Sequence, residues 1–247
     1  MRLDDLLIDR GLAADREVAM RLLLAGKVWV GNGDGARRDL KPGERVPANA
    51  SITLAQAPRF VSRGGEKLEA ALDQFNLEVA GRVCLDVGAS TGGFTDALLR
   101  RGATRVYALD VGRGQLAESL RNNARVVSME RTHVARLEPS SADHVALPEP
   151  VSLAVIDVSF ISLTRVLRGV VAALSGEGEL VALVKPQFEV AAADVPGGVV
   201  RDESARLGAI DKVVEFAKSI GLDVRGQMKS PLRGPAGNIE YLVHLAR

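Results

Sequence analysis

The sequence has little of what a secreted or membrane-spanning protein requires. One of its 247 residues is a cysteine, Cys84, so no disulfide can form within the chain. No hydrophobic run approaches the roughly 20 residues that cross a bilayer. The N-terminal residues 1–9 are acidic and helical in pattern, unlike a signal peptide. We therefore expect a cytoplasmic protein, with no membrane segment, in which Cys84 is a buried, reduced thiol.

The chain has only three histidines and a net charge close to zero. His133, His144 and His244 show no spacing typical of metal ligands, so we expect no metal site. The net charge of +1 gives no evidence for nucleic-acid binding through bulk charge. The chain is instead rich in apolar residues, at 47%, which suffices for one large domain or for a small and a medium one.

Residues 1–58 are predicted to form a small unit of their own. Leucines at helical spacing indicate a first helix, and a second helix follows Asp15, which can cap it, and ends at Gly26. A strand over 28–30, a tight glycine-rich turn over 31–35 and a strand near 51–54 follow. Because so few elements make a poor enzyme core, we interpret this unit as a recognition module.

This first unit resembles a known RNA-binding domain. The pattern consists of Arg2, Asp4, Leu6-Leu7, Gly11-Leu12, Arg16, Ala19 and Gly26-Lys27-Val28-x-Val30. It is similar to the domain first described in small-subunit ribosomal protein four, although the turn over 31–35 is longer than that family's usual Asn-Gly turn. The resemblance implies that the second helix and the loop after it dock on structured RNA. The expected RNA-binding residues, for which ordinary surface charge is the alternative, are Arg2, Arg16, Arg21, Lys27 and Arg63.

A joint over residues 59–66, marked by Pro58 and Gly64-Gly65, leads to a second domain at 67–247. Strand-like runs lie near 82–87, 105–111, 125–129, 151–158, 179–185, 222–228 and 239–245. Helical stretches lie near 92–101, 114–122, 161–174 and 204–220. Such alternation predicts an α/β fold with a mostly parallel, doubly wound sheet. The last two runs have no helix between them, which predicts a terminal antiparallel hairpin, and the whole resembles the Rossmann-like methyltransferases.

A glycine-rich turn follows the first strand of this domain. It lacks the Gly-x-Gly-x-x-Gly of dinucleotide sites and the Gly-Lys-Ser/Thr of phosphate loops. Its spacing instead resembles the S-adenosylmethionine loop, in which an acidic first residue suits the ammonium group of the methionine part. An Asp at the end of the next strand can accept hydrogen bonds from both ribose hydroxyls. The alternative is a tight turn with no ligand. The predicted cofactor-binding residues are Asp86, Gly88, Ser90, Thr91, Gly92, Gly93, Phe94, Asp110, Val111 and Glu130.

Two charges interrupt apolar runs that are long enough to be interior strands: Asp157 in Leu-Ala-Val-Ile-Asp-Val and Lys185 in Leu-Val-Ala-Leu-Val-Lys-Pro. An unpaired charge in such a place costs several kcal/mol. Ligands of open α/β sheets bind at the carboxyl ends of the strands. We therefore expect a polar site there, with a purely structural ion pair as the alternative.

Lys67 and Glu240 complete the order Lys-Asp-Lys-Glu, which resembles the ribose 2′-O-methyltransferases of the FtsJ type. Together with the first unit, and with Lys-Pro-Gln-Phe-Glu at 185–189, the chain resembles the TlyA (hemolysin A) family of rRNA methyltransferases. Two places depart from that family's pattern: Thr-His-Val-Ala-Arg at 132–136, and Arg206, where a histidine is expected. The resemblance implies transfer of a methyl group from S-adenosylmethionine to ribose 2′-hydroxyls of cytidine in rRNA, within ribosomal subunits or free RNA.

The chemistry suits these residue types. A ribose hydroxyl must lose its proton as it attacks the methyl group, and a lysine can take that proton only in its neutral form, which desolvation or a nearby like charge favours. We expect Lys185 to be the base, with Lys67 as the like charge. Asp157 would orient the amine, while Glu240 would balance Lys67 and position the ribose.

Three other functions stay open at this point. A non-catalytic RNA-binding assembly factor would keep the fold without the chemistry, which the intact tetrad disfavours. A pore-forming hemolysin would need an amphipathic or membrane-length segment, which the sequence lacks. A small-molecule O-methyltransferase would need no RNA-binding unit.

Overall fold

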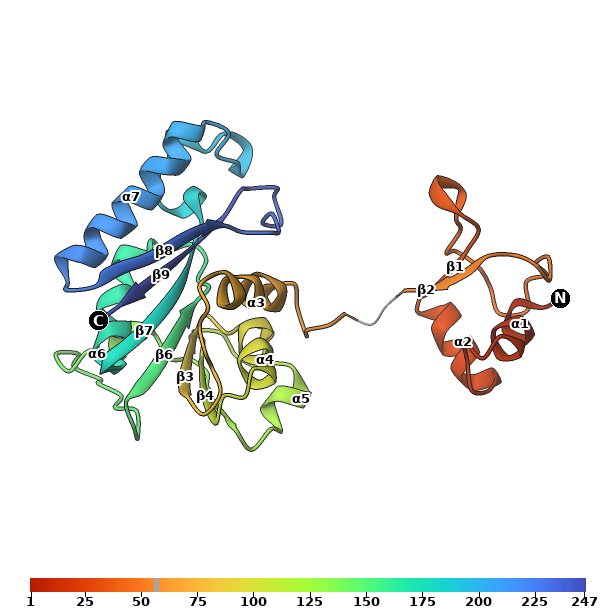
Figure 1. The fold of residues 1–247 in the computed structure, drawn as a ribbon, viewed down its shortest axis with the longest axis horizontal. Helices are drawn as coiled ribbons and strands as arrows, with labels where there is room; N and C mark the ends of the chain where they lie inside the picture. Colours follow the sequence, from red (N-terminus) through yellow and green to blue (C-terminus); the bar gives the residue numbers. More distant parts are fainter. Residues whose placement is uncertain (56–57) are drawn as a thin grey trace. The chain divides into compact units, whose positions relative to one another are not determined.

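The computed structural model describes residues 1–55 and 58–247, so residues 56–57, which precede the predicted joint, lie outside the described residues. The chain divides into two compact units, Met1–Pro58 and Arg59–Arg247 (Figure 1). Over the described ranges no helix is both long and apolar enough to cross a membrane.

The small unit packs two helices against a pair of short strands. Its elements are α1 (Leu3–Asp9), α2 (Arg16–Leu24), β1 (Val28–Val30), η1 (Gly33–Gly35) and β2 (Ile52–Leu54). The Asp15 carboxylate accepts a hydrogen bond from the Val18 amide at 2.8 Å, which confirms the predicted cap of α2. Strands β1 and β2 pair antiparallel, and the glycine-rich turn between them forms η1 and returns the chain so that Arg37 bridges to Val30. Leu3, Leu6 and Leu7 are fully buried in the core of this unit.

The large unit is built on a seven-stranded sheet in the order β5-β4-β3-β6-β7-β9-β8. The strands are β3 (Val83–Val87), β4 (Arg105–Leu109), β5 (Val126–Met129), β6 (Val151–Ile156), β7 (Leu174–Val184), β8 (Asp223–Lys229) and β9 (Tyr241–Ala246). Strands β3 to β7 run parallel, whereas β9 pairs antiparallel with both β7 and β8. This is the predicted Rossmann-like sheet with a terminal antiparallel hairpin.

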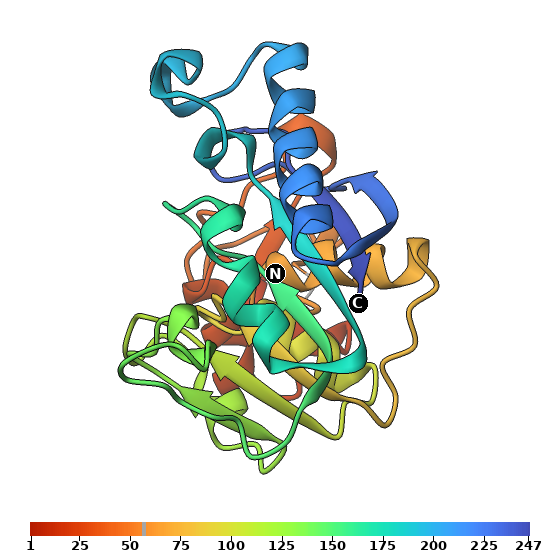
Figure 2. The same cartoon turned by 90° about the vertical axis from the view of Figure 1, so that its left-hand side faces the viewer.

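Helices cover both faces of the sheet. Helices α3 (Gly64–Gln74), α4 (Gly93–Arg100) and α5 (Glu118–Arg121) lie on one face, and α6 (Leu167–Ala173) and α7 (Glu203–Ser219) on the other (Figures 1 and 2). Side chains of a strand alternate between the two cores that result. In β6, Leu153 and Val155 pack toward α3 and α4, while Ala154 and Ile156 pack toward α6 and α7. Cys84 is buried, as predicted, and burial raises the pKa of its thiol to about 12.

Three predicted elements are shorter in the structure. The strand expected to reach residue 158 ends at Ile156, and the helix expected over 114–122 is reduced to α5. The helix expected over 161–174 is divided into η3 (Leu163–Arg165) and α6, because Ser162 caps the separate turn through a hydrogen bond from the Thr164 amide. Helix α3 begins at Gly64, within the segment predicted as a joint.

The separate cores predict that the two units unfold separately. Truncation of fully buried Leu6 to Ala costs about 2–5 kcal/mol in the small unit alone. Trp29, the single tryptophan, lies in β1 and reports on this unit, whereas circular dichroism reports mainly on the larger one. In urea, Leu6→Ala should lower the midpoint of the tryptophan transition and leave the main dichroism transition in place. The control is Leu24→Ala, at a side chain that is 74% exposed. Equal shifts of both transitions would show a single cooperative unit.

Candidate active site

The turn between β3 and α4 depends on glycine at two places. Gly88 has φ +85°, and a Cβ there would lie 2.4 Å from the carbonyl oxygen of Asp157. Gly92, with φ +97°, precedes the first turn of α4. Ser90 also adopts a left-handed backbone, at φ 49°. The residues of this turn that line the cavity are Gly88, Ala89, Ser90, Thr91, Gly93 and Phe94. Gly92 does not line it, and a Cβ there would lie 2.2 Å from the side chain of Leu120.

Asp86, predicted to meet the cofactor's ammonium group, lies behind this turn and lines neither of the two large cavities. It is fully buried and accepts a hydrogen bond from the Thr95 hydroxyl at 2.6 Å, which ties β3 to α4. Burial raises the pKa of Asp86 to about 7, against the lowering effect of the Thr95 bond, and the charges of Asp157 and Asp110 add to the rise. Its direct contact with a ligand stays a prediction.

Asp110 stands at the end of β4 with both oxygens fixed by the backbone. It accepts hydrogen bonds from the amides of Ser90 at 2.8 Å and Gly112 at 2.7 Å. Beside it, Val111 is exposed and lines a cavity of about 480 Å³ together with His133 and Val134. Glu130 does not reach this cavity. Its carboxylate accepts a hydrogen bond from the Gly114 amide at 2.7 Å and lines a small hollow behind the loop.

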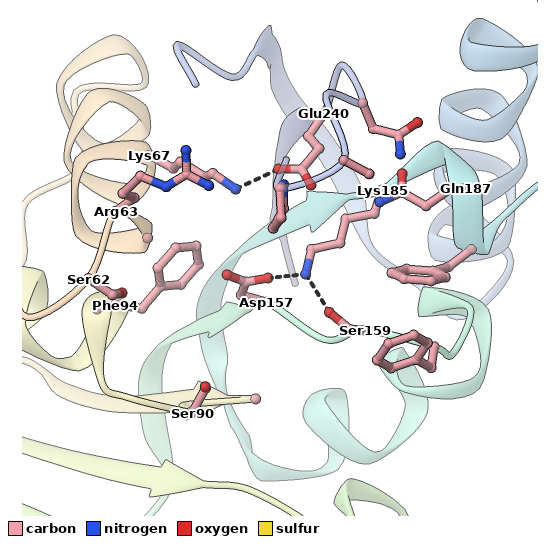
Figure 3. A pocket seen from close by; sticks show the side chains of 18 of the residues that line it. Ser62, Arg63, Lys67, Ser90, Phe94, Asp157, Ser159, Lys185, Gln187 and Glu240 are labelled. Atoms are coloured by element: carbon pink, nitrogen blue, oxygen red, sulfur yellow. Dashed lines mark hydrogen bonds and ion pairs between the residues drawn. The ribbon is translucent and has the colours of Figure 1, made fainter. Parts of the chain in front are cut away.

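The four charged residues predicted as a tetrad line one cleft of about 600 Å³ (Figure 3). Lys67 points from the first turn of α3 to Glu240, just before β9, and the two form an ion pair at 2.5 Å. Lys185 follows β7 and lies 2.6 Å from Asp157, which follows β6. The Lys67 and Glu240 side chains are 8% and 1% exposed, whereas Lys185 and Asp157 are 11% and 23% exposed. The two amines are thus buried to a similar extent, whereas the acid of the Lys67 pair is closed and the acid of the Lys185 pair is open to the cleft.

The sequence did not single out several other residues of the cleft. Ser159 accepts a hydrogen bond from the Lys185 amine at 2.8 Å. Phe160 is 91% exposed in a left-handed backbone at φ 66°, and its ring lies 5.2 Å from that of Phe188. Gln187, two residues after Lys185, also lines the cleft. Its place within Lys-Pro-Gln-Phe-Glu was the one available signal for it.

The predicted RNA-binding residues differ in their surroundings. Arg2 bonds to buried Asp4, and Arg16 pairs with Asp5, so both arginines take part in the small unit's own contacts. The hydrogen bond from Arg2 lowers the pKa of Asp4, and this effect outweighs the opposing effect of burial. Arg21, whose ion pair with Glu17 spans 3.9 Å, and Lys27 are exposed. In the large unit Arg63 is exposed on the wall of the cleft (Figure 3).

The buried carboxyl group predicts a pH-dependent stability. The unfolded chain ionises Asp86 near its ordinary pKa of 3.8, but the folded chain holds the proton to about 7. Native stability therefore falls as the pH rises through this window and levels above it, whereas Asp86→Asn lacks that slope. Urea unfolding across the window should show the variant gaining stability relative to the native protein. Asp223→Asn, at an exposed residue of β8, is the control. Parallel stability curves for native protein and Asp86→Asn would contradict the assignment.

Known proteins share both the fold and the length of this chain. Residues 60–247 match the FtsJ-like methyltransferase family. The chain is 47% identical to the 16S/23S rRNA (cytidine-2′-O)-methyltransferase TlyA of Mycobacterium tuberculosis, over 99% of this chain and 89% of the relative. It is 39% identical to hemolysin A of Brachyspira hyodysenteriae, over 99% of each. A solved structure described as a hemolysin, from Streptococcus thermophilus, is 44% identical, with a TM-score of 0.74 over 100% of this chain and 88% of that one. The predicted family is confirmed: the chain belongs to the FtsJ-like methyltransferases, which depend on S-adenosylmethionine, and among them to the TlyA proteins.

Proposed function

We propose that this protein methylates ribose 2′-hydroxyls of cytidine in rRNA, with Lys185 as the base. The observation that carries the proposal is the open ion pair of Lys185 and Asp157 in a cleft beside the glycine turn. The rRNA (cytidine-2′-O)-methyltransferase of Mycobacterium tuberculosis, 47% identical over nearly the whole chain, supports the choice of substrate.

The residues around the turn fit S-adenosylmethionine. Among the described residues, buried oxygens of Asp157, Gln187 and Glu240 line the cleft without a hydrogen-bond partner, so the site offers acceptors for ammonium and hydroxyl donors. The backbone from Gly88 to Gly93 would hold the methionine part. Asp110 would hold the ribose hydroxyls, and the cavity beside Val111 would take the adenine. When bound, the cofactor supplies a methyl group on a positively charged sulfur.

Lys185 provides the proton transfer in this scheme. Its neutral amine takes the proton of the ribose 2′-hydroxyl as that oxygen forms its bond to the methyl carbon, and the ammonium that results is stabilised by Asp157 at 2.6 Å. The closed pair of Lys67 and Glu240 holds one wall of the cleft, where the ribose would lie. Positioning of the hydroxyl against the methyl group supplies much of the rate.

The mouth of the cleft suits a nucleotide that has left its stack. Phe160 and Phe188 offer aromatic surface for a base, and single-stranded RNA is commonly recognised by such stacking. Arg63, exposed in the lining of the same cleft, is a donor for a phosphate group. A base and a phosphate flanking the ribose would place its 2′-hydroxyl in the cleft near Lys185.

Replacement of the base tests the chemistry directly. Lys185→Met keeps an unbranched side chain, one atom shorter, and removes the amine, so the rate constant for methyl transfer to rRNA should fall by about 10²–10⁴-fold. Cofactor affinity, measured by calorimetry, should change little. Lys229→Met, at an exposed residue of β8, is the matched control. Turnover within about threefold of the native protein would contradict the role of Lys185.

The small unit's exposed cations provide a second test. In Arg21→Glu/Lys27→Glu the KM for rRNA should rise and its dependence on salt should weaken, because two phosphate contacts are lost. Cofactor affinity and the kcat at saturating RNA should stay near native values. The control Arg225→Glu/Lys229→Glu makes the same charge change on β8. An unchanged KM for rRNA would show that Arg21 and Lys27 are ordinary surface charges and would contradict their role in RNA binding.

A further inference from the structure

The amine of Lys185 has two neighbours of different kinds. Asp157 Oδ1 lies 2.6 Å away as an ion pair, yet this oxygen has no partner in hydrogen-bond geometry. Ser159 Oγ, at 2.8 Å, accepts a true hydrogen bond from the amine. Coulomb attraction depends weakly on angle, whereas a hydrogen bond is directional. Asp157 therefore holds the charge close, and Ser159 sets the direction of the amine (Figure 3).

Ser159 is itself held in place on both sides. Before it, the Asp157 amide donates to the carbonyl oxygen of Val87 at 2.9 Å. After it, Phe160 adopts a left-handed backbone at φ 66°, an uncommon conformation for a bulky residue that neighbouring structure must impose. Ser159 is exposed at the cleft wall, so loss of its hydroxyl leaves no cavity in the core.

A buried carboxylate holds the residues that follow Phe160. Glu189 accepts hydrogen bonds from the Ser162 hydroxyl at 2.5 Å and the Leu163 amide at 2.7 Å. Lys212 of α7 balances its charge, with its amine 3.2 Å from the carboxylate and 2.7 Å from the Glu189 carbonyl. Glu189 also ends the 185–189 segment that begins at Lys185. The same carboxylate thus fixes the segment of the lysine and the loop of the serine relative to each other.

We propose that Ser159 is a positioning residue that aims the Lys185 amine at the substrate hydroxyl. The inference rests on the proposed function, in which Lys185 is the base. A neutral amine has one lone pair and two N–H bonds. With one N–H directed to Ser159 and the nitrogen held beside Asp157, the amine has less freedom to turn its lone pair away from the cleft.

Substitutions at Ser159 in the full-length protein test this role. Ser159→Ala should lower kcat for rRNA methylation by about 10- to 100-fold, the worth of a hydrogen bond to a charged group. The KM values for rRNA and cofactor should stay within about twofold of native. The hydroxyl accepts from the ammonium and so favours the protonated amine. In Ser159→Ala the acidic limb of the pH profile of kcat should therefore move to lower pH than in the native protein, while the maximal kcat falls.

Restoring the hydroxyl distinguishes a role of Ser159 in orienting the amine from a purely structural role. Ser159→Thr keeps the hydroxyl and should restore both the plateau and the limb, whereas Ser159→Gly should behave as the alanine variant does. Ser219→Ala, at the exposed end of α7, should match the native protein. Cofactor affinity and thermal midpoint, measured for each variant, establish that it is folded.

The outcomes distinguish this inference from the proposed function. If Ser159→Ala keeps the native kcat and the native acidic limb of the pH profile while Lys185→Met is inactive, only the role of Ser159 is overturned. The role of Ser159 is also overturned if Ser159→Ala lowers kcat without moving the acidic limb of the pH profile and Ser159→Thr does not restore activity. Full turnover by Lys185→Met, or no ribose methylation by the native protein, would overturn the proposed function and the inference with it.

Discussion

Neutralisation of charge at the carboxyl edge of a dry sheet is the constraint on which the cleft depends. A lone lysine or carboxylate beside strands as apolar as β6 and β7 would cost several kcal/mol. Each lysine is matched by an acid from a different segment: Lys67 by Glu240, and Lys185 by Asp157. Because Lys67 and Glu240 are 173 residues apart in sequence, their pairing joins α3 to the start of β9. Charge balance and site geometry therefore form together as the chain folds.

The two pairs have different exposure, and this difference suits different tasks. Lys67 and Glu240 are almost wholly enclosed, so little solvent screens their attraction. Lys185 and Asp157 line the same cavity with a more exposed acid, which suits the proposed role of Lys185 as the base.

Sequence patterns predicted much of this arrangement because they report local periodicity. Asp157 and Lys185 stood out as charges at the ends of apolar runs, and Gly88 as the glycine of a strand-to-helix turn. The same periodicity, applied more strictly, explains Asp86: it shares a strand face with Cys84 and points to Thr95 of α4, away from the cavities. The parts that escaped prediction are non-local. Glu189 contacts Leu163 across 26 residues, and no local pattern marks a carboxylate that will be buried in that way.

The loop after β6 links the two halves of the site. The Asp157 amide bonds to Val87, and its carbonyl oxygen lies where only a glycine at position 88 leaves room, so the loop lies directly against the cofactor turn. Two residues later Ser159 bonds to Lys185. A displacement of this loop would move its contacts with the glycine turn and with Lys185 together, so in the proposed scheme it couples the methyl donor to the base. In-line transfer tolerates little error in their separation, since a misplacement of about 1 Å can cost 10²-fold in rate. Glu189 ties this loop to the 185–189 segment through Ser162, so the loop is anchored at Val87 on one side of the left-handed residue Phe160 and at Glu189 on the other.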